Sequence, residues 1–169
     1  MKNQKGFTKI EILVVTAIVG LLGIMAVVSV MTARSRTRDA VRLSDVRQIQ
    51  SGLELYFIDT NSYPIMGDVT ALGTAVASCL GVDGFGAPCA TGDKTYLDVV
   101  PFTPTLGLSG ASTCSGYSNA YCYYSNSDEY YVQFELEHAN PQLELQKGVN
   151  CATPSGLDAG ACQTLTPVQ

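Results

Sequence analysis

Six cysteines carry the most distinctive chemistry in this sequence. Their thiols can form disulfides in an oxidising compartment, or bind zinc where their spacing allows it. Zinc sites use cysteines separated by about two to four residues, and neither that spacing nor a second histidine occurs here. The sequence therefore predicts disulfides outside the cytoplasm, and the short spacings favour the sequential pairs among many possible connectivities. In chain order the residues are Cys79, Cys89, Cys114, Cys122, Cys151 and Cys162.

Signals for catalysis are weak. His138 is the single imidazole, and it follows a predicted strand end, where a surface role is typical. The chain has no G-x-S-x-G, no H-E-x-x-H and no phosphate-binding loop. We therefore predict no catalytic residue, no cofactor and no metal, and keep a membrane-anchored extracytoplasmic enzyme as an alternative. Asp83, Asp93 and Asp98 leave a calcium site open, although the D-x-D-x-D-G pattern is absent.

Glu11 stands directly before a long apolar run. From Ile12 to Ala33 there is no charged residue and no proline. As a helix this run spans about 33 Å, close to the ~30 Å hydrocarbon core of a bilayer. It is too long for the apolar region of an ordinary secretory signal, which has about 7–15 residues. We expect a transmembrane helix with one acid near its start, where a carboxylate is tolerated if it finds a partner.

Charge is distributed unevenly along the chain. Residues 1–50 carry eight Lys and Arg against three Asp and Glu, whereas residues 51–169 carry two against twelve. This asymmetry excludes a uniformly basic nucleic-acid module, and we expect no nucleic acid partner. The hydrophobic content of 46% argues against a disordered acidic chain.

The stretch Gly6-Phe7-Thr8-Lys9-Ile10-Glu11-Ile12-Leu13-Val14-Val15 resembles the prepilin-type leader of type IV pilins and type II secretion pseudopilins. The resemblance implies a leader peptide at residues 1–6, cleavage by a prepilin peptidase between Gly6 and Phe7, and N-methylation of Phe7. It also implies that Glu11 takes part in assembly by docking on the N-terminal amine of a neighbouring subunit. An assembly ATPase, a membrane platform protein and membrane lipid are the further partners that it implies.

An amphipathic helix follows the apolar run. Apolar residues recur at three- and four-residue steps over residues 34–58, and a turn before Pro64 ends the pattern. We therefore expect one helix over residues 8–58, divided into a transmembrane part (7–33) and an amphipathic part (34–58). Five arginines lie between positions 34 and 47. They could contact acidic domains of neighbouring subunits, lipid headgroups or DNA, or form a solvated helix face.

Residues 59–169 are expected to form a small β head. Val132, Phe134 and Leu136 alternate with polar residues, which is typical of a half-buried strand, and residues 121–124 form a second strand in a hairpin. Further expectations are a strand at 94–100, a short strand around Leu143 and Leu145, loops at 65–92 and 103–118, and a loop-like tail at 148–169. Six tyrosines between 117 and 131 are expected to pack against the helix rather than form an adhesive surface.

Together these features predict an α+β fold, with a long N-terminal helix on an antiparallel β head. The predicted function is a structural subunit of a type IV pilus-like helical filament, built as a homo-oligomer. The alternative is a pseudopilin of a type II secretion or competence system. The expected location is the cytoplasmic membrane, crossed once with the N-terminus in the cytoplasm, and then an extracellular or cell-envelope filament.

Overall fold

The computed structural model describes residues 6–87, 89 and 92–163. The first five residues of the predicted leader lie outside that range. The chain divides into two compact units, residues 1–37 and residues 38–169. One helix, α1 (Lys9–Thr60), supplies most of the first unit and the first element of the second. The expected helix over residues 8–58 is thus confirmed to within two residues at each end.

The first unit is an isolated stretch of helix. Every described residue from Gly6 to Arg34 is exposed, including the whole apolar run. Hydroxyl side chains within the run, such as Thr16 and Ser29, donate hydrogen bonds to carbonyl oxygens three or four residues earlier. They therefore leave no polar hydrogen unpaired in an apolar surrounding. By length and composition α1 is able to cross a membrane.

In the second unit α1 buries one face against the sheets. Val46, Ile49 and Leu53 are fully buried, at the three- and four-residue steps that place them on one side of a helix. Gly52 lies beside them, and a Cβ there would come within 2.5 Å of Leu97 Cγ. The absent side chain thus lets the head approach the helix closely.

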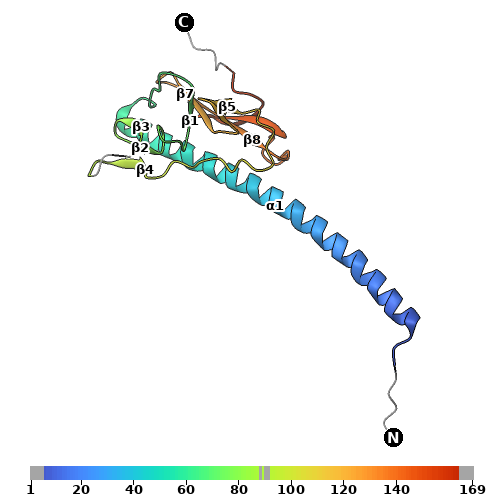
Figure 1. The fold of residues 1–169 in the computed structure, drawn as a ribbon. Coiled ribbons are helices and arrows are strands. Elements are labelled where there is room, and N and C mark those ends of the chain that lie inside the picture. Colours follow the sequence, from blue (N-terminus) through green and yellow to red (C-terminus); the bar gives the residue numbers. More distant parts are fainter. Residues whose placement is uncertain (1–5, 88, 90–91, 164–169) are drawn as a thin grey trace. The chain divides into compact units, whose positions relative to one another are not determined.

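Five antiparallel strands form the main sheet, in the order β1-β7-β8-β9-β10. Figure 1 labels β1, β7 and β8 of this sheet. The register places Tyr123 opposite Val132, and Val132 opposite Ala152, so these three core side chains lie in one row across the sheet. The strands are β1 (Thr70–Ala71), β7 (Cys122–Ser125), β8 (Tyr130–Leu136), β9 (Gly148–Thr153) and β10 (Gly156–Ala159).

Two smaller sheets complete the head. One has the order β3-β2-β4, from β2 (Cys79–Gly81), β3 (Gly84–Gly86) and β4 (Thr95–Leu97). The other pairs β5 (Thr113–Cys114) with β6 (Tyr117–Ser118). All of these strands have two or three residues, which explains why hydrophobic alternation did not reveal most of them.

The structure confirms the α+β fold and the predicted hairpin, which is formed by β7 and β8. The prediction of a loop-like tail was wrong, because β9 and β10 form a hairpin there and β9 pairs with β8. Inward-facing residues of β9 include Asn150 and Ala152, so the strand lacks a strong apolar alternation. Leu145 makes only an isolated bridge with Asn140 instead of the expected short strand.

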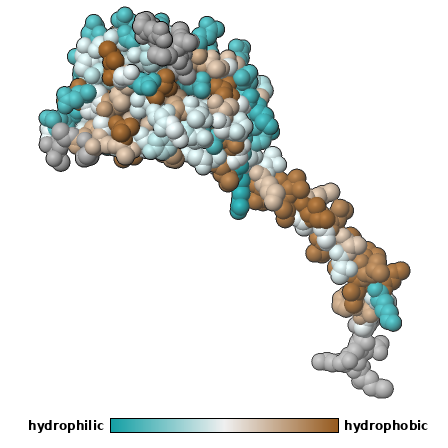
Figure 2. All heavy atoms as spheres, turned by 45° about the horizontal axis from the view of Figure 1, so that its top comes forward, coloured by the Kyte–Doolittle hydropathy of each residue, from teal (hydrophilic) through white to brown (hydrophobic). Residues whose placement is uncertain are grey.

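Tyrosines form a large share of the core. Tyr121, Tyr123 and Tyr130 are completely buried, and Tyr63 packs edge-on against Tyr130 with ring centroids 4.8 Å apart. Tyr117 alone among the six clustered tyrosines is exposed. The predicted packing is confirmed for the three buried tyrosines, which share the core with α1, whereas Tyr124 and Tyr131 are half-buried. Figure 2 shows the visible face of the head as mostly polar, with separate hydrophobic groups.

Candidate functional site

Glu11 and Thr8 cap the start of α1. The backbone amide of Glu11 donates to Thr8 Oγ1 at 3.3 Å, and the backbone amide of Thr8 donates to Glu11 Oε2 at 3.4 Å. This reciprocal arrangement is a capping box, in which the two side chains satisfy amides that no helical carbonyl can reach. Both hydrogen bonds are long and exposed, so Glu11 stays accessible to a stronger partner.

Gly6 and Phe7 precede the cap in non-helical conformation. Both are exposed, and the Phe7 side chain is 77% exposed. No described atom lies within 4 Å of the position that a Cβ on Gly6 would take. The peptide bond between them is therefore sterically accessible.

The apolar run has no partner within the described chain. Sixteen large hydrophobic side chains between Phe7 and Met31 are exposed. Burying one such side chain stabilises by about 1.5–3 kcal/mol, so this surface represents some tens of kcal/mol. That exceeds the ~5–15 kcal/mol net stability of a typical domain. The run must therefore lie in lipid or against other apolar surfaces.

A buried ionic clamp joins the head half of α1 to β8. Arg42 is completely buried, and Nη1 donates to Asp39 Oδ1 at 2.8 Å and to Glu137 Oε1 at 2.9 Å. Its Nε and Nη2 donate to the carbonyl oxygen of Pro104 at 3.2 and 2.7 Å, and Nη2 also donates to that of Leu106 at 2.7 Å. Because every nitrogen of the guanidinium donates a hydrogen bond, these bonds compensate much of the free-energy cost of moving its charge out of water.

Arg38 completes the clamp from one turn earlier. Its Nε and Nη2 donate to the two carboxylate oxygens of Glu137, each at 2.6 Å. These hydrogen bonds, and then those from Arg42, lower the pKa of Glu137 to about 2, although partial burial opposes the shift. Glu137 is therefore ionised at neutral pH.

Asp39 links the clamp to the end of β8. One carboxylate oxygen accepts the backbone amide of Glu137 at 2.8 Å, and the other accepts that of His138 at 3.0 Å. The second oxygen also lies 3.0 Å from His138 Nδ1. His138 is partly exposed, so the expectation of a surface residue holds, but its ring is held by the clamp.

Residues 98–111, which we term the strap, contact the outer face of β8 through Ser109 and Ala111. The buried carboxylate of Glu135 accepts hydrogen bonds from the backbone amide of Ser109 at 2.6 Å, from the Ser109 hydroxyl, and from the backbone amide of Ala111 at 3.0 Å. Burial alone raises the pKa of Glu135, but these hydrogen bonds outweigh it and leave the pKa below its ordinary value. The prediction of a half-buried β8 was therefore wrong, because the strap buries its polar face.

The arginines of α1 fall into two groups. Arg38 and Arg42 are committed to the clamp within one subunit, a use that none of the four alternatives for the five arginines included. Arg34, Arg36 and Arg47 are exposed. Within the described residues no carboxylate pairs with these three side chains.

Three disulfides fix the loops of the head. They join Cys79 to Cys89, Cys114 to Cys122 and Cys151 to Cys162, which are the sequential pairs that the spacing favours. Each closes a short loop that has little core of its own. By restricting the unfolded chain, each stabilises the head by roughly 2–3 kcal/mol.

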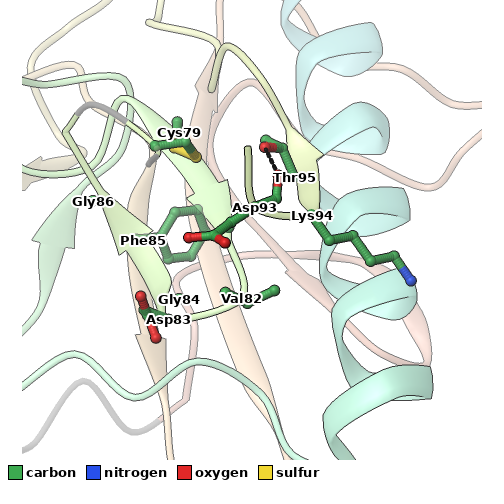
Figure 3. A pocket seen from close by; sticks show the side chains of 11 residues that line it. Cys79, Val82, Asp83, Gly84, Phe85, Gly86, Asp93, Lys94 and Thr95 are labelled. Atoms are coloured by element: carbon green, nitrogen blue, oxygen red, sulfur yellow. Dashed lines mark hydrogen bonds between the residues drawn. A yellow bond between two sulfur atoms is a disulfide. The ribbon is translucent and has the colours of Figure 1, made fainter. Parts of the chain in front are cut away.

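A pocket of about 210 Å³ lies among β2, β3 and β4. Figure 3 shows Asp83 and Asp93 at this pocket with carboxylates that do not converge on a common point. Among the described residues no three acidic, histidine or cysteine side chains gather as metal ligands. The calcium alternative thus gains no support from this geometry.

Comparison with known proteins places this arrangement in context. The type IV wide pilus major component PilA4 of Thermus thermophilus is 40% identical over 63 residues, which cover 37% of this chain and 48% of that protein. The chain is related to the type IV pilins and the type II secretion pseudopilins. Type II secretion system core protein G is 36% identical over 63 residues in Pseudomonas aeruginosa and 33% over 62 residues in Escherichia coli.

The similarity is partial. The matched part covers less than half of the length of these pilin and pseudopilin relatives. No protein-family model matches the chain, and no solved structure matches it.

Sequence reasoning missed two features of the site. The pattern Thr8-x-x-Glu11 is a capping-box signature and could have been recognised. The clamp was partly visible, since Asp39 and Arg42 stand three residues apart, as paired charges on a helix do. Their partner Glu137 is about 95 residues distant, so no local signal indicated the complete network.

Proposed function

We propose that this chain is the precursor of a structural subunit of a type IV pilus-like filament. One observation carries the proposal: α1 exposes a continuous apolar surface over residues 12–33 and begins with a weakly bonded carboxylate, Glu11. Such a helix suits storage in a bilayer and transfer into a bundle of identical helices. The similarity to a wide-pilus major component supports the same function.

Processing prepares the helix for assembly. A prepilin peptidase hydrolyses the accessible Gly6–Phe7 bond, and the new Phe7 amine is methylated. The mature chain keeps its apolar helix, because the cut precedes the run. Residues beyond Ala33 lie outside the cytoplasm, where the six cysteines oxidise.

On docking, Glu11 exchanges its weak contact with Thr8 for a stronger contact with a neighbouring subunit. In the free subunit Glu11 accepts one long hydrogen bond from Thr8. In the filament it accepts a hydrogen bond from the charged Phe7 amine of a neighbouring subunit, in which donor and acceptor are both ionised and which is typically about 2.7–2.9 Å long. The exposed apolar side chains then bury one another as an assembly ATPase and a platform protein extract the subunit from lipid.

Processing is tested with the Gly6→Val variant. We expect the wild-type chain to begin at a methylated Phe7 in mass spectra of membrane and filament fractions. The variant should keep its leader, since a branched side chain at the cleavage position obstructs the peptidase. A mature chain that begins at Phe7 in the variant contradicts the assigned cleavage site.

The docking role of Glu11 is separable from its capping role. Glu11→Gln keeps the capping box but removes the charge, whereas Thr8→Ala removes the cap but keeps the charge. We expect Glu11→Gln to insert into the membrane and yield few sheared fibres, and Thr8→Ala to assemble nearly normally. The opposite pattern would show that Glu11 only caps α1.

The second candidate function is that of a pseudopilin in a secretion or competence system. The similarity to type II secretion core protein G supports it. Electron microscopy distinguishes the two functions. Long sheared fibres that contain this chain indicate a pilus, whereas oligomers confined to the cell envelope indicate a pseudopilus.

A further inference from the structure

At the strap, charged side chains are buried and apolar side chains are exposed, which is the reverse of the usual arrangement in a folded domain. Beneath it lie charged side chains with almost no exposure, Arg42 and Glu135. On its outer surface Val99 is 72% exposed, Phe102 50% and Leu106 70%. Hydrogen bonds from Arg42 hold the carbonyl oxygens of Pro104 and Leu106, and the backbone amides of Ser109 and Ala111 donate to Glu135. The backbone amide of Val100 donates to the carbonyl oxygen of Ser78, so the strap backbone is held at several points. A rigid apolar surface of this kind is typical of a docking site.

A shallow hollow that is largely open to solvent lies elsewhere on the same head, with a volume of about 630 Å³. Leu55 of α1 is 53% exposed at this hollow, and the buried Tyr130 contributes to its lining. The lining residues are Arg47, Gln50, Ser51, Glu54, Leu55, Tyr130 and Pro154.

The strap and the hollow are formed by different residues of the head. The strap follows Leu97, which packs against Gly52 of α1, whereas the hollow is lined from α1 by Arg47, Gln50, Ser51, Glu54 and Leu55. A contact between the strap of one copy and the hollow of another therefore joins two unlike surfaces, and such a heterologous interface can propagate into an open helical filament.

Charge also matches between the two surfaces. Asp98 is exposed at the start of the strap, and Arg47 is exposed at the hollow. In the described part of the chain neither side chain takes part in a hydrogen bond or ion pair. Asp98 and Phe102 are at most about 13 Å apart in extended chain, and Arg47 and Leu55 are about 12 Å apart along a helix. One charged contact and one apolar contact can therefore form together.

We propose that the strap of one subunit docks into the hollow of a second copy of this chain. Phe102 packs against the exposed Leu55, and Asp98 pairs with Arg47. The inference rests on the proposed filament function and identifies the contact between heads that accompanies the packing of the apolar helices. Burial of Phe102 supplies the attraction, and the charge pair fixes the register.

A charge exchange tests this interface in cells that assemble the full-length chain. We expect Arg47→Asp and Asp98→Arg each to reduce the yield of sheared fibres about tenfold, because each places like charges together. The double variant should recover most of the yield. Asp83→Arg is the matched control, since it makes the same charge change at an exposed turn outside both surfaces. Single variants equal to this control, or a double variant as poor as the singles, would overturn the proposal.

Photo-crosslinking identifies the partner directly. With benzoylphenylalanine in place of Phe102, fibres should yield a dimeric adduct that mass spectrometry maps to residues 47–55 of a second copy. An adduct with another surface, an adduct with another protein, or no adduct in intact fibres overturns the interface and leaves the filament function standing. A wild-type chain that forms no filament at all refutes the proposed function, and this inference with it.

Discussion

Glu137→Gln is the sharpest test of the buried clamp. In the folded head, hydrogen bonds from Arg38 and then Arg42 hold the pKa of Glu137 at about 2, against an ordinary value of 4.5. One pKa unit corresponds to about 1.36 kcal/mol, so ionised Glu137 stabilises the fold by roughly 3 kcal/mol. Because the folded pKa is depressed, this contribution is complete above about pH 5 and is lost as the pH falls towards 2. We expect the variant to lose about 3 kcal/mol at pH 7 and to equal the wild type near pH 2.

Urea unfolding of the full chain in detergent micelles measures this difference. Near-ultraviolet circular dichroism reports the buried tyrosines, since the chain has nine tyrosines and no tryptophan. Glu144→Gln is the matched control, because Glu144 is exposed and forms no ion pair within the described residues. A difference between wild type and Glu137→Gln that stays constant from pH 7 to pH 2 would refute the assigned charge pairing. So would a loss no larger than that of the control.

Three further predictions concern the head. Gly107→Ala should destabilise the head by about 2–4 kcal/mol, because φ at Gly107 is +83° and a Cβ there would lie 2.1 Å from Glu137 Oε2. The control is Gly116→Ala, where φ is +79° but the surrounding space is open, and it should cost only about 1 kcal/mol in the same urea titrations. Replacing Cys151 and Cys162 together by serine should cost about 2–3 kcal/mol in urea, and an unchanged midpoint would show that this disulfide does not constrain the unfolded chain. Burial, with Glu54 nearby, raises the pKa of Tyr63 to about 12, so the neutral Tyr63 side chain stabilises the fold below pH 10 and this stabilisation is lost towards pH 12. Tyrosinate absorbance that titrates fully near pH 10 in a folded chain would contradict this burial.

Local patterns predicted the elements that depend on local physics. The absence of charge over residues 12–33 and the three- and four-residue periodicity after it predicted α1, because both properties repeat within a few turns of helix. The β7–β8 hairpin was predictable for a similar reason, since strong alternation flanks a polar turn. Short cysteine spacings favoured the observed pairs because loops of this size close readily.

Elements that depend on distant partners escaped prediction. The hairpin of β9 and β10 is stable because β9 pairs with β8, and its own sequence of glycine, asparagine and threonine gives little indication of a strand. Likewise, Glu135 has the alternation of an exposed residue, and its burial depends on a strap more than twenty residues away in the chain.

The sequence by itself determined the long helix, its apolar surface, the carboxylate at its start and the relation to pilins, because each depends on residue types at short spacing. Only the tertiary structure determined which charged side chains pair within the subunit and which remain exposed. Arg38 and Arg42 of α1 pair with Glu137, while Arg47 remains exposed at the hollow, and all three look alike in the sequence. The physical reason is that pairing of a charge depends on what the fold places within about 3 Å of it, and here those groups are almost a hundred residues away along the chain.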